Sequence, residues 1–368
     1  MKLIVLKNNL KGVLDAAAKT VGESSNLPVL KHVLIAAEGS RVRVVATNLE
    51  AAITKSSAAK VMESGEVVVP YALIASVVGN LQSERINLEN RGVNLLLTTE
   101  NYEATIQGVA PEEFPIIPRV KNETEYIELQ GSVLKERLLK VSTAAQISEL
   151  RPEISGVLIS IEAGSLKFVA TDSYRLAEAT VSPSQFTSLC SRPLRVILPL
   201  KTVSEVVRII PDGSVRVTFD ESQVLVSGED TQIISRLIGG VYPEYERIIP
   251  KKFMAEITVE KNELMNALRL GSAFSVKTNE IVVRSEKDGK FIEIGAADST
   301  VGENKYLIPA KISGEGVHIA LNWRFLLDGL KSISSPTVTC SIEEDGKKAI
   351  VRIPGDTSYF YLVMFNLR

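Results

Sequence analysis

The sequence predicts an α+β protein built from three tandem copies of one domain. Short landmarks recur at about one third of the chain length. Ala46-Thr47-Asn48 returns as Ala170-Thr171-Asp172 and, more weakly, as Ala296-Ala297-Asp298, at offsets of 124 and 126 residues in a chain of 368. Phe114-Pro115 likewise returns as Tyr242-Pro243 after 128 residues. Repetition at a fixed period is typical of tandem structural repeats.

A helical pattern in the second half of each copy repeats with the same period. Its apolar residues lie at i, i+3, i+4 and i+7, the spacing of an amphipathic helix. The three sets are Ile74, Val77, Val78 and Leu81; Val203, Val206, Val207 and Ile210; and Leu326, Gly329, Leu330 and Ile333. We therefore expect domains at 1–120, 127–250 and 255–368, separated by polar or proline-bearing joints.

Each copy also divides into two similar halves. In the first copy, residues 2–6 are strand-like, the next segment is helical with Asn8 as its N-cap, and three strand-like segments follow before the order repeats. This β-α-β-β-β order predicts about two dozen strands and six helices, at 8–21, 71–81, 133–146, 200–210, 262–275 and 323–333. Successive strands must pair antiparallel, because a parallel return needs a long crossover.

Composition excludes several classes of protein. The chain is 45% hydrophobic and 23% charged, and no apolar run approaches the roughly 20 residues of a membrane helix, so a cytoplasmic location without membrane contact is expected. Cys190 and Cys340 lack the spacing of a disulfide framework, and His32 and His318 have no second ligand nearby, so no metal site is expected. Phosphate-binding loops and catalytic motifs are absent, which predicts no cofactor.

The predicted helices carry more positive charge than the rest of the chain. They hold ten basic and five acidic residues, although the net charge of the chain is −2. Because the apolar stripe of each helix must face its sheet, the cations are left on the solvent side. If all six helices share one side, they form a positive track suited to phosphate backbones. The alternative is a set of ordinary solvated helix faces, since Lys and Arg are good helix formers.

Four segments resemble the bacterial sliding clamp, the β subunit of the replicative DNA polymerase: SNLPVLKHVLI (25–35), ATDSYRLA (170–177), GGVYPEYERIIP (239–250) and YLVMFNLR (361–368). The resemblance spans the whole chain. It implies a head-to-tail homodimer whose six domains close into a ring, with helices lining a hole for duplex DNA and antiparallel sheets forming the outer wall. The positive track would then face DNA without reading its sequence. The cations expected to do so are Lys11, Lys135, Arg137, Lys140, Lys201, Arg208, Arg269 and Lys331.

The resemblance also implies partners and the absence of catalysis. Polymerase chemistry would reside in the replicative polymerase catalytic subunit, which the ring tethers, and a separate ATP-dependent clamp loader would open the ring. These and other proteins with clamp-binding motifs would insert a short peptide into a pocket between the second and third domains. Carried over by position, the pocket residues are Ile154, Thr171, Ser173, Tyr174, Arg175, Leu176, Pro243, Ile248, Leu362, Val363, Met364, Phe365, Asn366 and Leu367.

The C-terminal tail departs from the family pattern. Members usually end in a Met-Pro-Met-Arg-Leu-like tail, whereas this chain ends Met364-Phe365-Asn366-Leu367-Arg368. An aromatic residue replaces the proline, and the cationic and apolar residues exchange order. The expected site is still an apolar cleft with polar and cationic edges, which suits a few anchoring side chains of a peptide.

Two alternative functions follow from the residues. The density of polar groups from Thr171 to Arg175 could indicate an enzyme, but nucleophilic catalysis needs a base oriented by a third group. Asp172 could act as that base, yet its counterpart in the first copy is Asn48, and both residue types stabilise turns. The second alternative is a peptide-binding repeat scaffold unconnected with DNA, which shares the pocket but not the positive track.

Overall fold

The computed structural model describes residues 1–22, 26–121, 123–162 and 164–366. Within these residues the chain forms six α-helices and 26 strands, in an order that repeats three times. The helices are α1 (Lys7–Ala17), α2 (Tyr71–Asn80), α3 (Gly131–Ser142), α4 (Leu200–Ile209), α5 (Lys261–Ser272) and α6 (Trp323–Lys331). In this part of the chain, no helix is both long and apolar enough to cross a membrane.

Each repeat contains the predicted β-α-β-β-β unit twice, so this prediction is confirmed. The first repeat has β1 (Lys2–Leu6), β2 (His32–Glu38), β3 (Arg41–Thr47), β4 (Ala51–Ala58), β5 (Lys60–Glu63), β6 (Gly65–Pro70), β7 (Arg85–Arg91), β8 (Asn94–Thr98) and β9 (Glu103–Ile106). The second has β10 (Tyr126–Gln130), β11 (Gly156–Glu162), β12 (Ser165–Thr171), β13 (Arg175–Val181), β14 (Phe186–Ser188), β15 (Leu194–Pro199), β16 (Ser214–Phe219), β17 (Gln223–Ser227) and β18 (Thr231–Arg236). The third has β19 (Phe253–Glu260), β20 (Glu280–Ser285), β21 (Phe291–Asp298), β22 (Gly302–Gly314), β23 (His318–Asn322), β24 (Thr337–Glu343), β25 (Lys348–Arg352) and β26 (Tyr359–Met364).

The strands form three antiparallel sheets, two of which run from one repeat into the next. Strand β18 pairs with β4, which joins the second repeat to the first in a nine-stranded sheet. Strand β26 pairs with β13, which joins the third repeat to the second in a twelve-stranded sheet. The chain consequently divides into two compact units whose boundary passes through α3 and α4 of the middle repeat.

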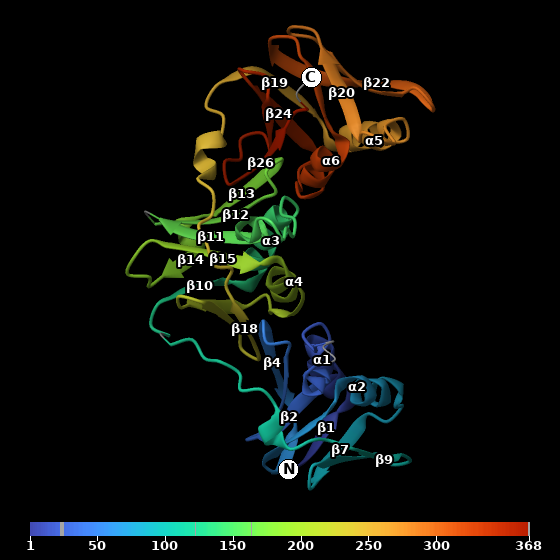
Figure 1. Cartoon of the computed structure of the whole chain (residues 1–368), viewed down its shortest axis with the longest axis vertical. Coiled ribbons are helices and arrows are strands. Elements are labelled where there is room, and N and C mark those ends of the chain that lie inside the picture. The colour runs from blue at the N-terminus through green and yellow to red at the C-terminus, as the bar shows by residue number, and fades with distance from the viewer. Residues whose placement is uncertain (23–25, 122, 163, 367–368) are drawn as a thin grey trace. The chain divides into compact units, whose positions relative to one another are not determined.

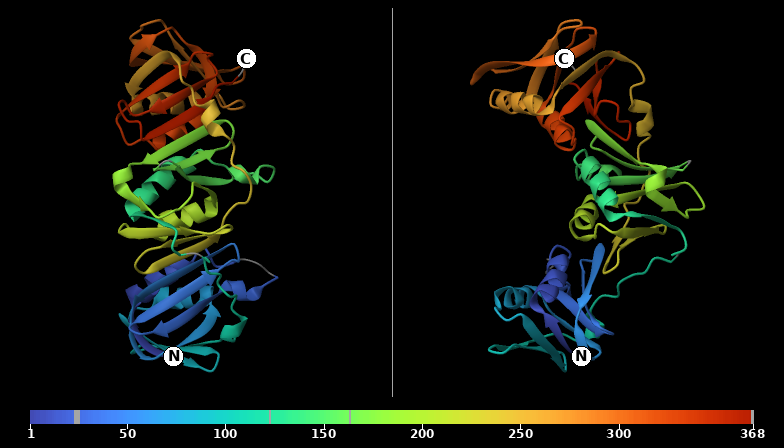
Figure 2. Two further views of the ribbon diagram at one scale, coloured as in Figure 1. Left: turned by 90° about the vertical axis from the view of Figure 1, so that its left-hand side faces the viewer. Right: turned by 180° about the vertical axis from the view of Figure 1, so that it is seen from behind.

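The helices bury the apolar stripes that the sequence predicts. Ile74 and Val78 of α2 are fully buried, and so are Val206 of α4 and Leu330 of α6. In the first repeat α1 and α2 lie side by side, and in the third repeat α5 and α6 do the same (Figures 1 and 2). Burying these stripes against the sheets supplies the main driving force for each core.

Helix boundaries are where the structure corrects the sequence prediction. Helix α1 begins at Lys7, so Asn8 lies inside its first turn and is not the N-cap. The main-chain N–H of Lys7 donates to the carbonyl of Glu84 (2.7 Å), which satisfies one of the free donors at this helix end. Helices α1 and α3 end four residues before the predicted positions, because the apolar pattern continues into the turns that follow them.

Candidate functional site

The segment Thr171–Arg175 forms a tight turn between β12 and β13. The Thr171 hydroxyl donates to the main-chain carbonyl of Arg175 (2.7 Å). The Asp172 carboxylate accepts the main-chain N–H groups of Tyr174 and Arg175, at 3.0 and 3.1 Å. Ser173 adopts a left-handed φ of 80°, and its N–H donates to the Thr171 hydroxyl. These polar side chains build the turn, a role that Asp and Thr commonly play.

The first repeat contains the same turn. The Thr47 hydroxyl donates to the carbonyl of Ala51 (2.9 Å), and the Asn48 side chain accepts the N–H groups of Glu50 and Ala51. Leu49, the counterpart of Ser173, also has a left-handed φ, of 72°. The predicted turn role of Asn48 and Asp172 is therefore confirmed. Among the described residues, no group of three or more His, Cys, Asp or Glu side chains forms a possible metal site.

Several residues of the predicted pocket meet in one apolar cluster. Strands β13 and β26 place Leu176 opposite Leu362, and Ile154 packs beside them. All three are at least 97% buried, and Met364 packs against the same cluster. The cluster also contains Leu158, Val169, Ile197, Tyr242, Tyr245 and Ile350. Strands β13 and β26, which carry Leu176 and Leu362, belong to different repeats, so the cluster lies where the predicted pocket was expected.

The tail alternates between two faces of β26. Leu362 and Met364 face the cluster, whereas Val363 and Phe365 line a cavity of about 30 Å³ inside the third repeat. The main-chain N–H of Asn366 donates to the carbonyl of Ala320 (2.8 Å). Val363 and Phe365 therefore lie away from the cluster, because successive residues of a strand point to opposite faces. Leu367 lies outside the described residues.

The segment that carries Pro243 and Ile248 is anchored by a buried tyrosine. The Tyr245 hydroxyl donates to Glu178 (2.7 Å), and the Lys167 ammonium lies 3.1 Å from the same carboxylate. Burial, together with the hydrogen bond to Glu178, raises the pKa of Tyr245 above its usual range. This anchor holds the segment against the apolar cluster and leaves Ile248 41% exposed at its end.

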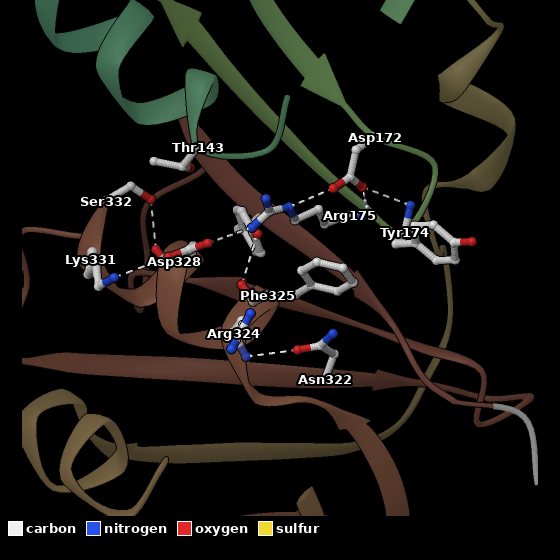
Figure 3. Close-up of polar contacts among 12 residues, drawn as sticks. Thr143, Asp172, Tyr174, Arg175, Asn322, Arg324, Phe325, Asp328, Lys331 and Ser332 are labelled. Carbon is white, nitrogen blue, oxygen red and sulfur yellow. Dashed lines mark hydrogen bonds and ion pairs between the residues drawn. The ribbon is translucent and has the colours of Figure 1, made fainter. Parts of the chain in front are cut away.

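Arg175 is held between two carboxylates at the edge of the cluster. Its Nε lies 2.9 Å from Asp172, and its Nη1 lies 2.8 Å from Asp328 of α6 (Figure 3). The guanidinium also lies over the ring of Phe325, 4.7 Å from the ring centroid. Phe325 in turn stacks with Tyr174, with 6.0 Å between the ring centroids. Figure 3 shows this group together, with residues from the turn and from α6.

The charge of Arg175 is stable in this environment. Burial disfavours the charged form, but Tyr361, Asp328 and Asp172 outweigh that effect and hold the pKa of Arg175 above its ordinary value. A second cation at this edge, Arg151, bonds to Ser173 and to Glu153, at 2.9 and 3.1 Å. Both cations are thus engaged by the protein itself.

Sequence reasoning missed the contribution of α6 to this site. Phe325 and Asp328 lie three residues apart, next to the apolar stripe that the periodicity identified. Arg175 and Asp328 are 153 residues apart in the chain, so no local pattern connects them. The one available signal was the acidic residue at the matching position of α4, Glu205, which marks that place in the repeat.

The cations expected to face DNA fall into two groups. Lys11, Lys201 and Arg269 are exposed, and the described structure records no ion pair for them. Lys135 is partly exposed, and Lys331 is exposed but lies 3.1 Å from Asp328. This first group can reach a ligand in solvent.

The side chains of the remaining three cations are at most 33% exposed. Arg137 is only 9% exposed. The Lys140 ammonium lies 2.6 Å from Glu136 and over the ring of Tyr359. Arg208 bonds to Glu205 and to main-chain carbonyls of α1. Helical periodicity located the solvent side of each helix, but it did not show which cations a neighbouring element covers.

Comparisons with known proteins agree with this architecture. Three family models match in succession: the N-terminal domain of the DNA polymerase III beta subunit at residues 1–118, its central domain at 128–244 and its C-terminal domain at 246–366. The beta sliding clamp of Synechococcus elongatus is 27% identical over 372 residues, which cover 99% of this chain and 98% of that protein.

Two solved structures show the same fold. The DNA polymerase sliding clamp of Bacillus subtilis has a TM-score of 0.93 at 23% identity and covers 100% of this chain and 99% of its own. The sliding clamp of Pseudomonas aeruginosa bound to griselimycin also has a TM-score of 0.93 at 23% identity and covers 100% of both chains.

The three repeats, the sheets shared between them and the cluster at the second joint together define a protein of the sliding-clamp class. Because family models cover nearly the whole length, the chain belongs to the DNA polymerase III beta subunit family. Family membership makes it a processivity clamp and gives no support to a scaffold unconnected with DNA.

Proposed function

We propose that two copies of the chain close head to tail into a ring around duplex DNA. The observation that carries this proposal is that two strands, β9 and the first part of β22, each have one edge unpaired in the described residues. At the two joints inside the chain, β4 pairs with β18 and β13 pairs with β26. The corresponding strands at the ends of the series are β22 in the third repeat and β9 in the first. In the described residues, β9 pairs only with β8, and residues 302–309 of β22 pair only with β21.

A third joint of the same kind would pair β22 of one copy with β9 of the other. Two identical head-to-tail joints close a dimer into a ring, whereas unclosed joints of this type give filaments. The joint would also cover two strand edges that otherwise invite unspecific association. Copying the register of β4 with β18 places Lys305 opposite Glu103 in the new joint, where opposite charges on neighbouring strands attract.

The three domains of each copy are proposed to span 1–120, 127–250 and 255–368, which agrees with the ranges of the family models. The exposed cations Lys11, Lys201 and Arg269, with Lys135 and Lys331, would contact backbone phosphates inside the ring. Such contacts are independent of base sequence and weaken as salt increases. The less exposed cations Arg137, Lys140 and Arg208 would contribute mainly to the positive electrostatic field inside the ring.

The cluster around Leu176 and Leu362 is proposed to take a peptide from partner proteins. The replicative polymerase catalytic subunit, the ATP-dependent clamp loader and other proteins with clamp-binding motifs are the expected partners. Polymerase chemistry would reside in the partner, and the ring would work in the bacterial cytoplasm. Apolar anchors in a cleft with polar edges are typical of peptide recognition.

Retention on DNA tests the ring directly. A ring loaded by its clamp loader should stay on closed circular DNA and run off the free ends of the same DNA after it is cut. Equal release from both substrates would contradict the proposal. The mass in solution gives a second test: a dimer of the 40.1 kDa chain is expected, and a strict monomer at micromolar concentration would exclude ring closure by two copies.

A further inference from the structure

The turn of the second repeat is linked to α6 of the third through Arg175, which contacts Asp172, Asp328 and Phe325; we call this set of contacts the interlock. Its centre is the Arg175 guanidinium, which Asp172 holds from its own turn and Asp328 holds from α6, at 2.9 and 2.8 Å. The Arg175 side chain is 11% exposed, Asp172 is 4% exposed and Asp328 is 35% exposed. Asp328 is thus the outer member of the group, and Figure 3 shows it between Arg175 and Lys331.

Helix α6 is itself fixed in the place where it makes this contact. The Tyr361 hydroxyl donates to the carbonyl of Phe325 (2.9 Å). A Cβ on Gly329 would lie 2.4 Å from the Tyr361 ring, so only glycine permits this close approach. The Phe325 ring stacks with Tyr174, and the Arg175 guanidinium lies over the same ring. The position of the turn therefore depends on the position of α6.

The first joint lacks this interlock although it has the same fold. The position of Arg175 is occupied there by Ala51, and the position of Asp328 by Glu205. Glu205 instead bonds to Arg208 of its own helix. The acidic residue in the second helix is thus used differently at the two joints. Only the joint with the candidate peptide site combines it with an arginine from the turn.

The two arginines at the edge of the site, Arg175 and Arg151, are both hydrogen-bonded to groups of the protein. Arg175 and its two carboxylates form a group in which the guanidinium already has strong hydrogen-bonded partners. Arg151 is engaged by Glu153 and Ser173 in the same way. Tyr174 lies open to a ligand at this edge, because it is 62% exposed, and its ring is stacked on Phe325.

We propose that Asp328 is a positioning residue of the peptide site: it keeps Arg175 turned away from the ligand and fixes Tyr174 on Phe325, so that the edge presents a neutral aromatic surface. The inference rests on the proposed peptide-binding function. The edge then takes an uncharged, largely apolar part of the ligand. Removing the Asp328 carboxylate frees one arm of Arg175 and loosens the contact between the turn and α6.

The first test needs no ligand. Phenylglyoxal labelling of intact protein, followed by peptide mapping, reports how accessible each arginine is. Arg175 should label slowly in the wild type and several-fold faster in Asp328→Asn, which keeps the shape of the side chain. Glu205→Gln, the matching change at the first joint, should leave the labelling of Arg175 unchanged. Equal labelling of Arg175 in the wild type and in Asp328→Asn overturns the inference.

The second test uses griselimycin as the probe, because the similar sliding clamp of Pseudomonas aeruginosa binds it, and measures its binding by calorimetry. Asp328→Asn should bind it about tenfold more weakly, an effect between those of exposed and buried ion pairs, and Glu205→Gln should bind like the wild type. In an Arg175→Met background, Asp328→Asn should have no further effect, because it acts through Arg175. If the two substitutions reduce the affinity additively, or if Asp328→Asn leaves the affinity unchanged, Asp328 does not act by positioning Arg175. Failure of the wild type to bind would contradict the peptide site instead, while the labelling result still decides the interlock.

Discussion

The Arg208 guanidinium in α4 donates to the main-chain carbonyl of Ala16 at the end of α1, with a distance of 2.7 Å. A second donor of the same group reaches the carbonyl of Asp15 at 2.8 Å. The last carbonyls of a helix lack partners inside the helix, and an arginine can satisfy them. Arg208 of α4, in the second repeat, therefore caps the C-terminal end of α1 in the first repeat.

Replacing this arginine is expected to affect stability. Arg208→Ala should lower the free energy of unfolding by about 1–2 kcal/mol, because two carbonyls lose a charged donor at a partly exposed site. Lys201→Ala, on the same helix and without a recorded partner, should change it by less than about 0.5 kcal/mol. Urea unfolding of both variants makes the comparison. Equal effects would show that the bonds of Arg208 are not formed in solution.

The proposed joint between copies can be tested through one charge pair. Lys305→Glu should weaken the dimer, because it would place two carboxylates on neighbouring strands. Glu103→Lys should weaken it similarly, and the two changes together should restore much of the lost affinity. Sedimentation equilibrium gives the dissociation constants. Lys311→Glu is the control, because that part of β22 already pairs with β19 within the chain. Failure of the double change to recover affinity would exclude the predicted register.

The repeated architecture was predictable from the sequence because it depends on burial. Apolar spacing located α2, α4 and α6, since residues such as Val78 and Leu330 must point into a core, and the repeated order of elements predicted the other three helices. The turn role of Asp172 followed from its counterpart Asn48, because both side chains bond to their own main chain. Helix ends were less accurate, because the apolar pattern does not stop where the helix stops.

The interactions of individual cations were not predictable in this way. Arg208 and Lys201 occupy the same predicted solvent face, yet only Arg208 reaches another repeat. The same holds for Asp328, whose partner Arg175 lies far away in the chain. Such contacts are set by how one repeat packs on the next, and a single sequence carries periodicity but not that packing. Phe365 shows the same limit, because strand alternation decides which face a tail residue occupies.

An ion pair at the first joint predicts a dependence of stability on pH. The Lys55 ammonium lies 2.8 Å from Asp230 and 2.6 Å from the Thr231 hydroxyl. Burial opposes ionisation of Asp230, but Lys55 and Thr231 outweigh it, so the pKa of Asp230 lies below its ordinary value of 3.8. A lowered carboxyl pKa contributes stability above the unfolded value, and this contribution is lost as the pH falls through the folded value.

Lys55→Met should therefore lower the free energy of unfolding by about 0.5–1 kcal/mol at pH 7, given the partial exposure of the pair. The difference from the wild type should shrink as the pH falls below 3.8 and vanish once Asp230 is protonated. Urea unfolding between pH 3 and pH 7 measures it. Lys60→Met, an exposed lysine with no recorded partner on β5, is the control and should show no such dependence. A difference that persists unchanged in acid would assign the effect to the packing of the Lys55 stem.

The tail offers a last test, because Phe365 belongs to the core of the third repeat. It is 8% exposed and lies with Leu326 and Cys340 around the cavity of about 30 Å³. Phe365→Ala should lower the free energy of unfolding of the third repeat by about 3 kcal/mol, since large-to-small changes in a core leave a cavity. Removal of Met364–Arg368 should destabilise this repeat at least as much, so that truncation cannot report on peptide binding alone.

Phe291→Ala provides the matched control, because Phe291 lies in the same repeat and is 55% exposed. Its effect on unfolding should stay within about 0.5 kcal/mol. Hydrogen exchange read by mass spectrometry locates the loss: in Phe365→Ala, protection should fall in β24 and β25, while β7 and β8 of the first repeat keep theirs. If Phe365→Ala and Phe291→Ala unfold alike, the aromatic ring does not occupy the core in solution. The tail would then be free to line the peptide site, as its alignment with the family suggested.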